Sequence, residues 1–200
     1  SALLETAMLL LGMALALPFV LLARCLRPFV LIRFGPMGNT GRIGNLAPDT
    51  EMYLCERELR ESRPRRLDLF YYENLPCNQQ MRKMADRELN IYSFTRFLDL
   101  INRGLPGGAK NHIRNNSDNF HRHKPLAKTS IHLSFTHNEE RRGSQALRQW
   151  NVSPEAPFFC FIARDPAYLV SEYPDGDYRY HDYRNCDINN YIPAADELTR

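Results

Sequence analysis

The sequence is poor in cysteine, and its five cysteines are widely spaced. Even the two nearest in the chain, Cys55 and Cys77, are 22 residues apart. No CxxC pair and no zinc-knuckle spacing therefore occurs. An odd number of scattered cysteines is typical of free thiols in a reducing compartment, and it argues against a disulfide framework.

The sequence also lacks an excess of charge of either sign. It has 26 basic and 23 acidic residues, which leaves a net charge of +3. This balance excludes the strongly basic surface typical of nucleic-acid binding, so nucleic acid is not expected as a partner. Three common catalytic signatures are missing as well, because the chain contains no GxSxG, no HExxH and no P-loop GK[ST].

The first segment is a long apolar run. Thr6 to Ala23 comprises 18 residues without a charge; as a helix it is about 27 Å long, close to the thickness of a bilayer core. Arg24, Arg27 and Arg33 follow it, and by the positive-inside tendency we expect the bulk of the chain on the cytoplasmic face of the membrane. We predict a membrane anchor over residues 1–27, spanning or monotopic. A buried core helix and a cleaved signal peptide are the alternatives.

Strand-like runs alternate with helical patterns along the rest of the chain. Strands are expected at Phe29–Phe34, Glu51–Cys55, Leu67–Tyr72, Asn90–Tyr92 and Phe158–Ala163. Helices are expected at Arg42–Ala47, closed by Pro48, at Gln79–Leu89, at 94–103 after a Ser93 cap, at His137–Trp150 and at Asp187–Thr199. This alternation predicts an α/β fold with parallel strands.

Two α/β units are expected rather than one. Pro154 and Pro157 mark a boundary, which gives an N-terminal Rossmann-like domain at 28–150 and the start of a second one at 151–200. The second unit has one strand, one long loop and one helix. We therefore expect an incomplete domain whose missing part begins with a further strand just after Arg200.

A glycine-rich loop follows the first expected strand, with glycines at 35, 38, 41 and 44. Four triplets without many prolines cannot sustain a collagen helix. At the carboxyl edge of a parallel sheet, the exposed amides of such a loop suit a phosphate or an acceptor hydroxyl. The alternative is a tight turn that requires positive φ.

A second polar group surrounds the last expected strand and helix. Its members are Arg164, Asp165, His181, Asp182, Arg184, Asn185 and Asp187. Their expected place is also a carboxyl edge, where a histidine, two arginines and an asparagine suit a diphosphate and a ribose. An internally salt-bridged loop, in which the aspartates neutralise the arginines, is the equal alternative.

The histidines at 112, 121, 123, 132 and 137 invite a metal interpretation. The His121-Phe-His123 stretch lacks companion carboxylates or cysteines at the usual ligand spacings. We therefore predict a solvated basic loop and no metal site.

Four stretches resemble a family of bacterial putative glycosyltransferases from surface-polysaccharide loci: FVLIRFG, RIGNLAPDTEMYLCER, FFCFIARDPAYL and YHDYRNCDINNYIPAADELTR. The resemblance covers residues 26–200 and the apolar segment before them. It implies the GT-B architecture, in which two Rossmann-like domains enclose the active site. It also implies sugar transfer from a nucleotide-sugar to a lipid-linked or saccharide acceptor, with no metal or other cofactor.

A more distant similarity, to heptosyltransferase-type enzymes, concerns the catalytic base. The aspartate that acts as base there matches Asn45, and an amide cannot accept a proton at neutral pH. In the closer family a histidine is expected at this position, where this chain has Asn45. The base would therefore lie elsewhere, and the candidates are Asp49 and Glu51. A chain without a base would instead be a non-catalytic sugar- or nucleotide-binding protein, or a scaffold with a degenerate GT-B fold.

The resemblance also assigns the two substrates to different parts of the chain. The acceptor side is expected at Arg33, Gly38, Gly41, Arg42 and Gly44. The donor side is expected at Arg164, Asp165, His181, Asp182, Arg184 and Asn185.

Overall fold

The computed structural model describes residues 2–60, 65–114, 125–153, 155–172 and 174–199. The chain forms two compact units, Ser1–Glu140 and Arg141–Arg200, and each is described here by itself. Their border lies within helix α5 (His137–Gln149), ten residues before the boundary expected from the prolines.

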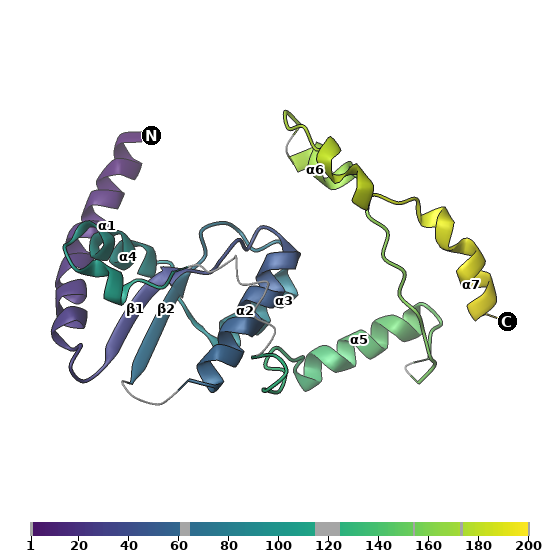
Figure 1. The fold of residues 1–200 in the computed structure, drawn as a ribbon, viewed down its shortest axis with the longest axis horizontal. Coiled ribbons are helices and arrows are strands. Elements are labelled where there is room, and N and C mark those ends of the chain that lie inside the picture. The colour runs from purple at the N-terminus through teal and green to yellow at the C-terminus, as the bar shows by residue number, and fades with distance from the viewer. Residues whose placement is uncertain (1, 61–64, 115–124, 154, 173, 200) are drawn as a thin grey trace. The chain divides into compact units, whose positions relative to one another are not determined.

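A parallel three-stranded sheet forms the centre of the first unit (Figure 1). Strand β1 (Leu31–Pro36) pairs with β2 (Arg66–Tyr71), and β2 pairs with β3 (Asn90–Ile91). The register sets Arg33 opposite Asp68. The expectation of an α/β fold with parallel strands is confirmed, and all three strands of this sheet lie where the sequence predicts them.

Helices cover both faces of the sheet, with α1 and α4 on one side and α2 and α3 on the other (Figure 1). Their bounds are Ala2–Cys25 for α1, Ile43–Glu58 for α2, Gln79–Glu88 for α3 and Thr95–Gly104 for α4. Because side chains alternate along a strand, Leu69 packs with the α1–α4 core and Phe70 with the core beside α2. Helices α3, α4 and α5 were predicted, but Ser93 does not cap α4, whose N-cap residue is Phe94.

Two predictions fail at α2. The expected short helix ending at Pro48 and the expected strand Glu51–Cys55 are one helix of 16 residues, with Pro48 inside it. The proline removes a single backbone hydrogen bond. In return, continuing the helix buries Leu46, Thr50 and Leu54, which follow one another at a spacing of four on one face.

Helix α1 contributes one face of its second half to the core. Ala16, Val20 and Ala23 are buried in a cluster with Phe34 and Leu98. The outward positions carry large apolar side chains that stay exposed: Leu11, Leu15, Phe19 and Leu22. In the part of the chain that the structure describes, no helix combines the length and the apolar character needed to cross a membrane.

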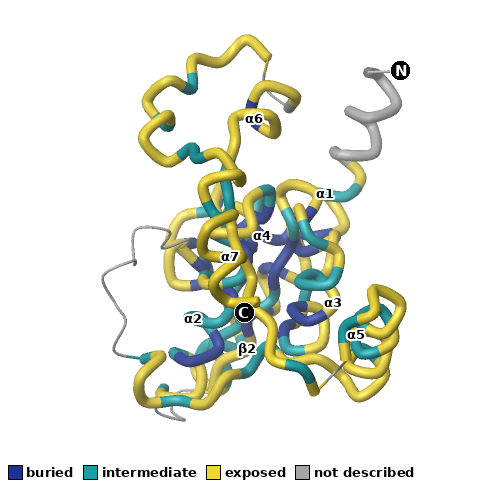
Figure 2. Tube along the Cα trace, turned by 90° about the vertical axis from the view of Figure 1, so that its right-hand side faces the viewer, coloured by how far each residue is buried: buried dark blue, intermediate teal, exposed yellow. Residues whose placement is uncertain are grey.

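The described part of the second unit contains the greater part of α5 and several short helices. The short ones are α6 (Ala167–Glu172), α7 (Ile192–Leu198) and two 3₁₀ turns, Arg179–Arg184 and Ile188–Tyr191. The predicted buried strand Phe158–Ala163 is wrong, because this run is unpaired and most of its side chains are exposed (Figure 2). A strand needs a neighbour for its backbone hydrogen bonds, and no described residue pairs with this run in a sheet.

Candidate functional site

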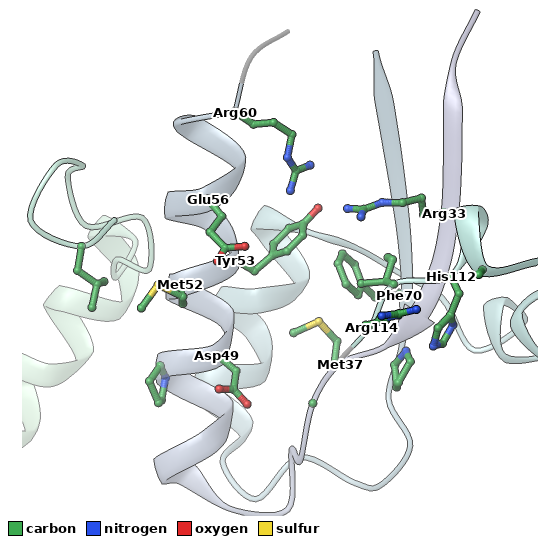
Figure 3. Close-up of a pocket in the computed structure, with 16 residues that line it drawn as sticks. Arg33, Met37, Asp49, Met52, Tyr53, Glu56, Arg60, Phe70, His112 and Arg114 are labelled. Carbon is green, nitrogen blue, oxygen red and sulfur yellow. The ribbon is translucent and has the colours of Figure 1, made fainter. Parts of the chain in front are cut away.

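A pocket of about 390 Å³ lies between α2, the end of β1 and the residues that follow the 3₁₀ turn Gly108–Asn111 (Figure 3). Its volume falls in the range of small-molecule sites. The charged and polar side chains at its wall are Arg33, Asp49, Tyr53, Glu56, Arg60, His112 and Arg114.

Helix α2 supplies the acidic side of the pocket. Asp49, Met52, Tyr53 and Glu56 recur at spacings of three and four residues, so they project from one helix face (Figure 3). One carboxylate oxygen of Asp49 is buried and has no hydrogen-bond partner among the described residues. Burial raises the pKa of Asp49 above its usual value. A carboxyl group with such a pKa in a pocket wall is a candidate acid or base.

The opposite wall is held by an ion pair. Arg33 Nε lies 2.7 Å from Asp68 Oδ1, and the Tyr53 hydroxyl donates to Asp68 Oδ2 at 2.6 Å. Burial acts to raise the pKa of Asp68, but the hydrogen bonds from Arg33 and Tyr53 outweigh it, and the net shift is downward. Arg60 NH1 lies 3.5 Å from the same carboxylate. The charge of Arg33 is therefore balanced inside the protein, and this residue shapes the wall.

His112 lies in the pocket wall because the backbone of residues 112–113 runs close to β1. A parallel bridge pairs it with Phe34, and the amide of Ile113 donates to the carbonyl of Phe34 at 2.8 Å. Gly35 makes this approach possible, because a Cβ at that position would lie 2.6 Å from the Cβ of Ile113. The glycine thus acts through close packing, and its backbone does not adopt positive φ.

A buried aspartate orients the His112 ring. Asp99 projects from α4, is fully buried, and lies 2.7 Å from His112 Nδ1 through its Oδ1. Its Oδ2 receives the Tyr71 hydroxyl at 3.2 Å and Arg103 Nε at 3.2 Å. Burial, followed by the charge of Asp99, raises the pKa of Tyr71 to about 12. When Nδ1 carries the hydrogen toward Asp99, His112 Nε2 is left able to accept a proton.

Arg114 stands two residues beyond His112 at the same pocket. It is exposed, and it forms no hydrogen bond or ion pair with any described residue. The pocket therefore combines an oriented histidine, a carboxyl group with a raised pKa and an uncommitted cation. These groups suit a ligand that offers a hydroxyl to be deprotonated and carries negative charge nearby.

The predicted acceptor-side and catalytic residues divide between the pocket and its surroundings. Arg33, Gly38 and Asp49 line it. Asn45, Gly41, Arg42 and Gly44 do not, although all of them lie at or near the start of α2. Residues 38–41 do form a turn, but no glycine of the 35–44 loop has positive φ, so the expected backbone conformation is wrong.

Glu51 is also outside the pocket. Its carboxylate accepts hydrogen bonds from the amides of His132 and Leu133 at 2.8 and 2.9 Å. His121 and His123 lie outside the described residues.

The predicted donor-side residues all belong to the second unit. The amide of Cys186 donates to the carbonyl of Arg164 at 2.9 Å, which joins the two segments that carry them. Asp165 caps the start of α6 through the amide of Ala167. Asn185 Nδ2 donates to Asp182 Oδ1 at 3.2 Å.

Neither arginine of this group is neutralised. Arg164 and Arg184 form no ion pair with a described residue, so the salt-bridged alternative is not observed. The positive charges of Arg164 and Arg184 thus remain available to a ligand.

Sequence reasoning missed Asp99 and His112. Asp99 had a detectable signal, because Thr95, Asp99 and Asn102 recur on the same face of α4 as the buried Leu98. Polar residues on a core-facing stripe call for internal partners. His112 had no such signal, since it lies in an irregular segment.

Comparison of the chain with models of protein families, with curated proteins and with solved structures finds no match. The chemistry of the pocket therefore carries the functional argument.

Proposed function

We propose that this chain belongs to a GT-B glycosyltransferase that moves a sugar from a nucleotide-sugar to a lipid-linked or saccharide acceptor in bacterial cell-surface glycan assembly. The observation that carries the proposal is the His112–Asp99 pair at the wall of a pocket beside the parallel sheet. The first unit would bind the acceptor there.

The reaction requires a base. The acceptor oxygen forms a bond to the anomeric carbon of the sugar, and the bond from that carbon to the diphosphate breaks. The nucleoside diphosphate leaves with the electron pair, and the hydroxyl proton must go to a base. His112 Nε2 would take this proton while Asp99 stabilises the imidazolium that forms. This role does not depend on Asn45, which cannot serve as a base.

The other pocket groups would position the acceptor. Asp49 has a buried carboxylate oxygen without a partner among the described residues, and this oxygen would accept a hydrogen bond from a sugar hydroxyl. Arg114 would attract the negative charge of a lipid-linked acceptor or of the departing diphosphate.

The donor would bind the second unit. Arg164 and Arg184 are the free cations there, with Asp165, His181, Asp182 and Asn185 beside them. Positive side chains stabilise a leaving diphosphate without a metal ion, which is how the proposed transfer would proceed. The complete GT-B enzyme would close two Rossmann-like domains around both substrates.

A membrane surface is the proposed location. The exposed face of α1, with Leu11, Leu15, Phe19 and Leu22, would lie in the cytoplasmic leaflet of the inner membrane while the opposite face stays in the core. A helix whose exposed face is apolar is able to bury that face at the level of the head groups.

Replacement of the histidine tests the proposal. His112→Gln should lower kcat for sugar transfer by roughly 10²- to 10⁴-fold and leave KM nearly unchanged, because a general base acts on the chemical step. Asp99→Asn should lower kcat by about tenfold or more, because it removes the partner that orients the ring. The measurement is transfer of labelled sugar from a panel of nucleotide-sugars to a cell-envelope lipid extract.

His137→Gln is the matched control, since His137 starts α5 away from the pocket and should leave the rate unchanged. A His112→Gln enzyme with wild-type kcat would overturn the assignment of the base. Nucleotide-sugar binding without any turnover by the complete wild-type enzyme would instead favour the non-catalytic alternative.

A further inference from the structure

A second cluster of chemically active side chains lies on α2, outside the pocket lining. Glu51 and Cys55 are four residues apart and therefore share one face of the helix. His132, from the segment that follows the undescribed residues 115–124, packs against both of them. Cys55 is only 1% exposed, so its thiol is placed in the protein interior.

The three ligand atoms are close enough to surround one ion. His132 Nδ1 lies 2.8 Å from Glu51 Oε1 and 3.9 Å from Cys55 Sγ, and the sulfur lies 3.8 Å from the same Glu51 oxygen. Zinc–ligand bonds of about 2.0–2.3 Å place neighbouring tetrahedral ligands roughly 3.3–3.6 Å apart. The observed separations bracket this range, so small side-chain adjustments suffice.

We propose that Glu51, Cys55 and His132 bind a zinc ion, with water in the fourth position. A thiolate, an imidazole and a carboxylate together form a donor set that zinc favours over the harder magnesium and calcium ions. The proposal is independent of sugar transfer, because none of the three residues lines the pocket.

The surroundings of the cluster match those of a metal site. Glu58 Oε2 lies 2.9 Å from His132 Nε2, the nitrogen that would face away from the ion. Metal-bound histidines almost always donate their second N–H to such an acceptor, which fixes the ring. The amides of His132 and Leu133 hold the two oxygens of Glu51 in the same way.

A metal-free explanation divides the cluster into two unrelated parts. A protonated His132 between Glu51 and Glu58 would account for both carboxylates. Cys55 would then be a small apolar core residue that happens to lie beside them. Zinc ligation gives all three side chains one common role.

The ion would fasten the segment around His132 to α2. The same segment brings Leu126 to the pocket, and α2 carries Asp49 and Tyr53 there. The proposed role is therefore to hold two parts of the pocket wall together.

Cobalt titration of the untagged wild-type protein tests the proposal. Co²⁺ should bind in a 1:1 ratio and produce a thiolate-to-cobalt charge-transfer band, and added Zn²⁺ should displace it. Cys55→Ser should abolish the band, and His132→Gln should weaken binding by about 100-fold or more. Glu58→Gln should weaken it by roughly 10- to 100-fold, because it removes only the group that orients the ring.

Cys77→Ser and His137→Gln are matched controls at residues outside the cluster, and they should leave binding unchanged. Absence of the band in the wild-type protein would overturn the proposal, as would wild-type affinity in a folded Cys55→Ser or His132→Gln variant. Circular dichroism establishes folding, and if Cys55→Ser does not fold, the wild-type band and Glu58→Gln decide. Activity is not measured, so failure of the glycosyltransferase proposal leaves this result intact.

Discussion

At the residue scale, Asp68 determines the geometry of one pocket wall. Its side chain is 4% exposed, yet it stays ionised because Arg33 and Tyr53 donate to it and Arg60 lies nearby. Removing only the carboxylate would leave a half-buried guanidinium without its counter-charge. A buried charge without a partner lowers the free energy of unfolding by more than the loss of an ion pair exposed to water does.

Asp68→Asn should therefore lower the free energy of unfolding by roughly 2–3 kcal/mol at neutral pH. The native-state pKa of Asp68 is depressed, so its contribution is complete above the unfolded pKa of about 4 and disappears as the pH falls through the native value. The gap between variant and wild type should thus shrink below about pH 4. Urea unfolding at several pH values measures it.

Asp177→Asn is the control for this substitution, because Asp177 forms an exposed ion pair with Arg179. Its unfolding curve should match that of the wild type. Equal stabilities of Asp68→Asn and wild type at neutral pH would contradict the prediction.

At the element scale, residues 112–113 are able to pack beside β1 because Gly35 has no side chain. Gly35→Ala places a Cβ within 2.6 Å of both the Cβ and the carbonyl oxygen of Ile113, so the segment must move. Overpacking of this kind costs about 1–3 kcal/mol. It should also displace His112 and lower kcat for sugar transfer.

Gly44→Ala provides the contrast, because a Cβ there meets nothing within 4 Å. The residue lies inside α2, where alanine is favoured over glycine by about 0.5–1 kcal/mol. Thermal unfolding should show a lower Tm for Gly35→Ala and a slightly higher Tm for Gly44→Ala. A Tm for Gly35→Ala at or above the wild-type value would contradict the packing argument.

The sequence predicts an element correctly where the spacing of its apolar residues agrees with the way the element packs in the fold. Strands β1 and β2 are apolar runs between polar segments, and α4 has a clear helical stripe. The Glu51–Cys55 run failed because Met, Tyr, Leu and Cys in succession also fit a strand. Only the spacing of Leu46, Thr50 and Leu54 over a longer window identifies the helix. Phe158–Ala163 failed because strand formation depends on a partner that local sequence does not specify.

The candidate site was predictable only in part, for a similar reason. Arg33 and Gly38 were identified from their place at the first strand and the loop after it, and Asp49 as a possible base in place of Asn45. The His112–Asp99 contact joins a helix to an irregular segment, so tertiary packing alone brings the two residues together. His132 was dismissed as a loop residue, since its partners Glu51 and Cys55 lie about 80 positions earlier in the chain.

At the scale of the whole molecule, α1 is a helix with two apolar faces and two different environments. One face belongs to the core, and the exposed face supports the proposed membrane contact. Burial of a large apolar side chain in a bilayer is worth about 1.5–3 kcal/mol, and each 1.4 kcal/mol changes binding about tenfold. The helix is therefore able to hold the protein at a surface while remaining packed on the sheet.

A charge on the exposed face should release the protein from lipid. Leu15 and Phe19 are 62% and 63% exposed, so the double variant Leu15→Glu, Phe19→Glu should fold but lose vesicle binding by about 100-fold or more. The measurement is co-sedimentation with vesicles of phosphatidylethanolamine and phosphatidylglycerol.

Leu75→Glu is the control at a still more exposed leucine away from α1, and it should bind as the wild type does. Undiminished sedimentation of the double variant would refute a surface role for α1.

The arginines at the end of α1 have a practical consequence for anyone who shortens this protein. Arg24 donates to the carbonyls of Asn102 and Pro106 at 2.8 Å, and Arg27 donates to the side chain of Asn111, the residue before His112. Trimming the apolar segment to improve solubility would strip these donors from the turn that leads to the histidine. A trimmed protein that proves inactive would therefore say little about the proposed catalysis, because the turn that leads to His112 would have lost its hydrogen bonds to α1.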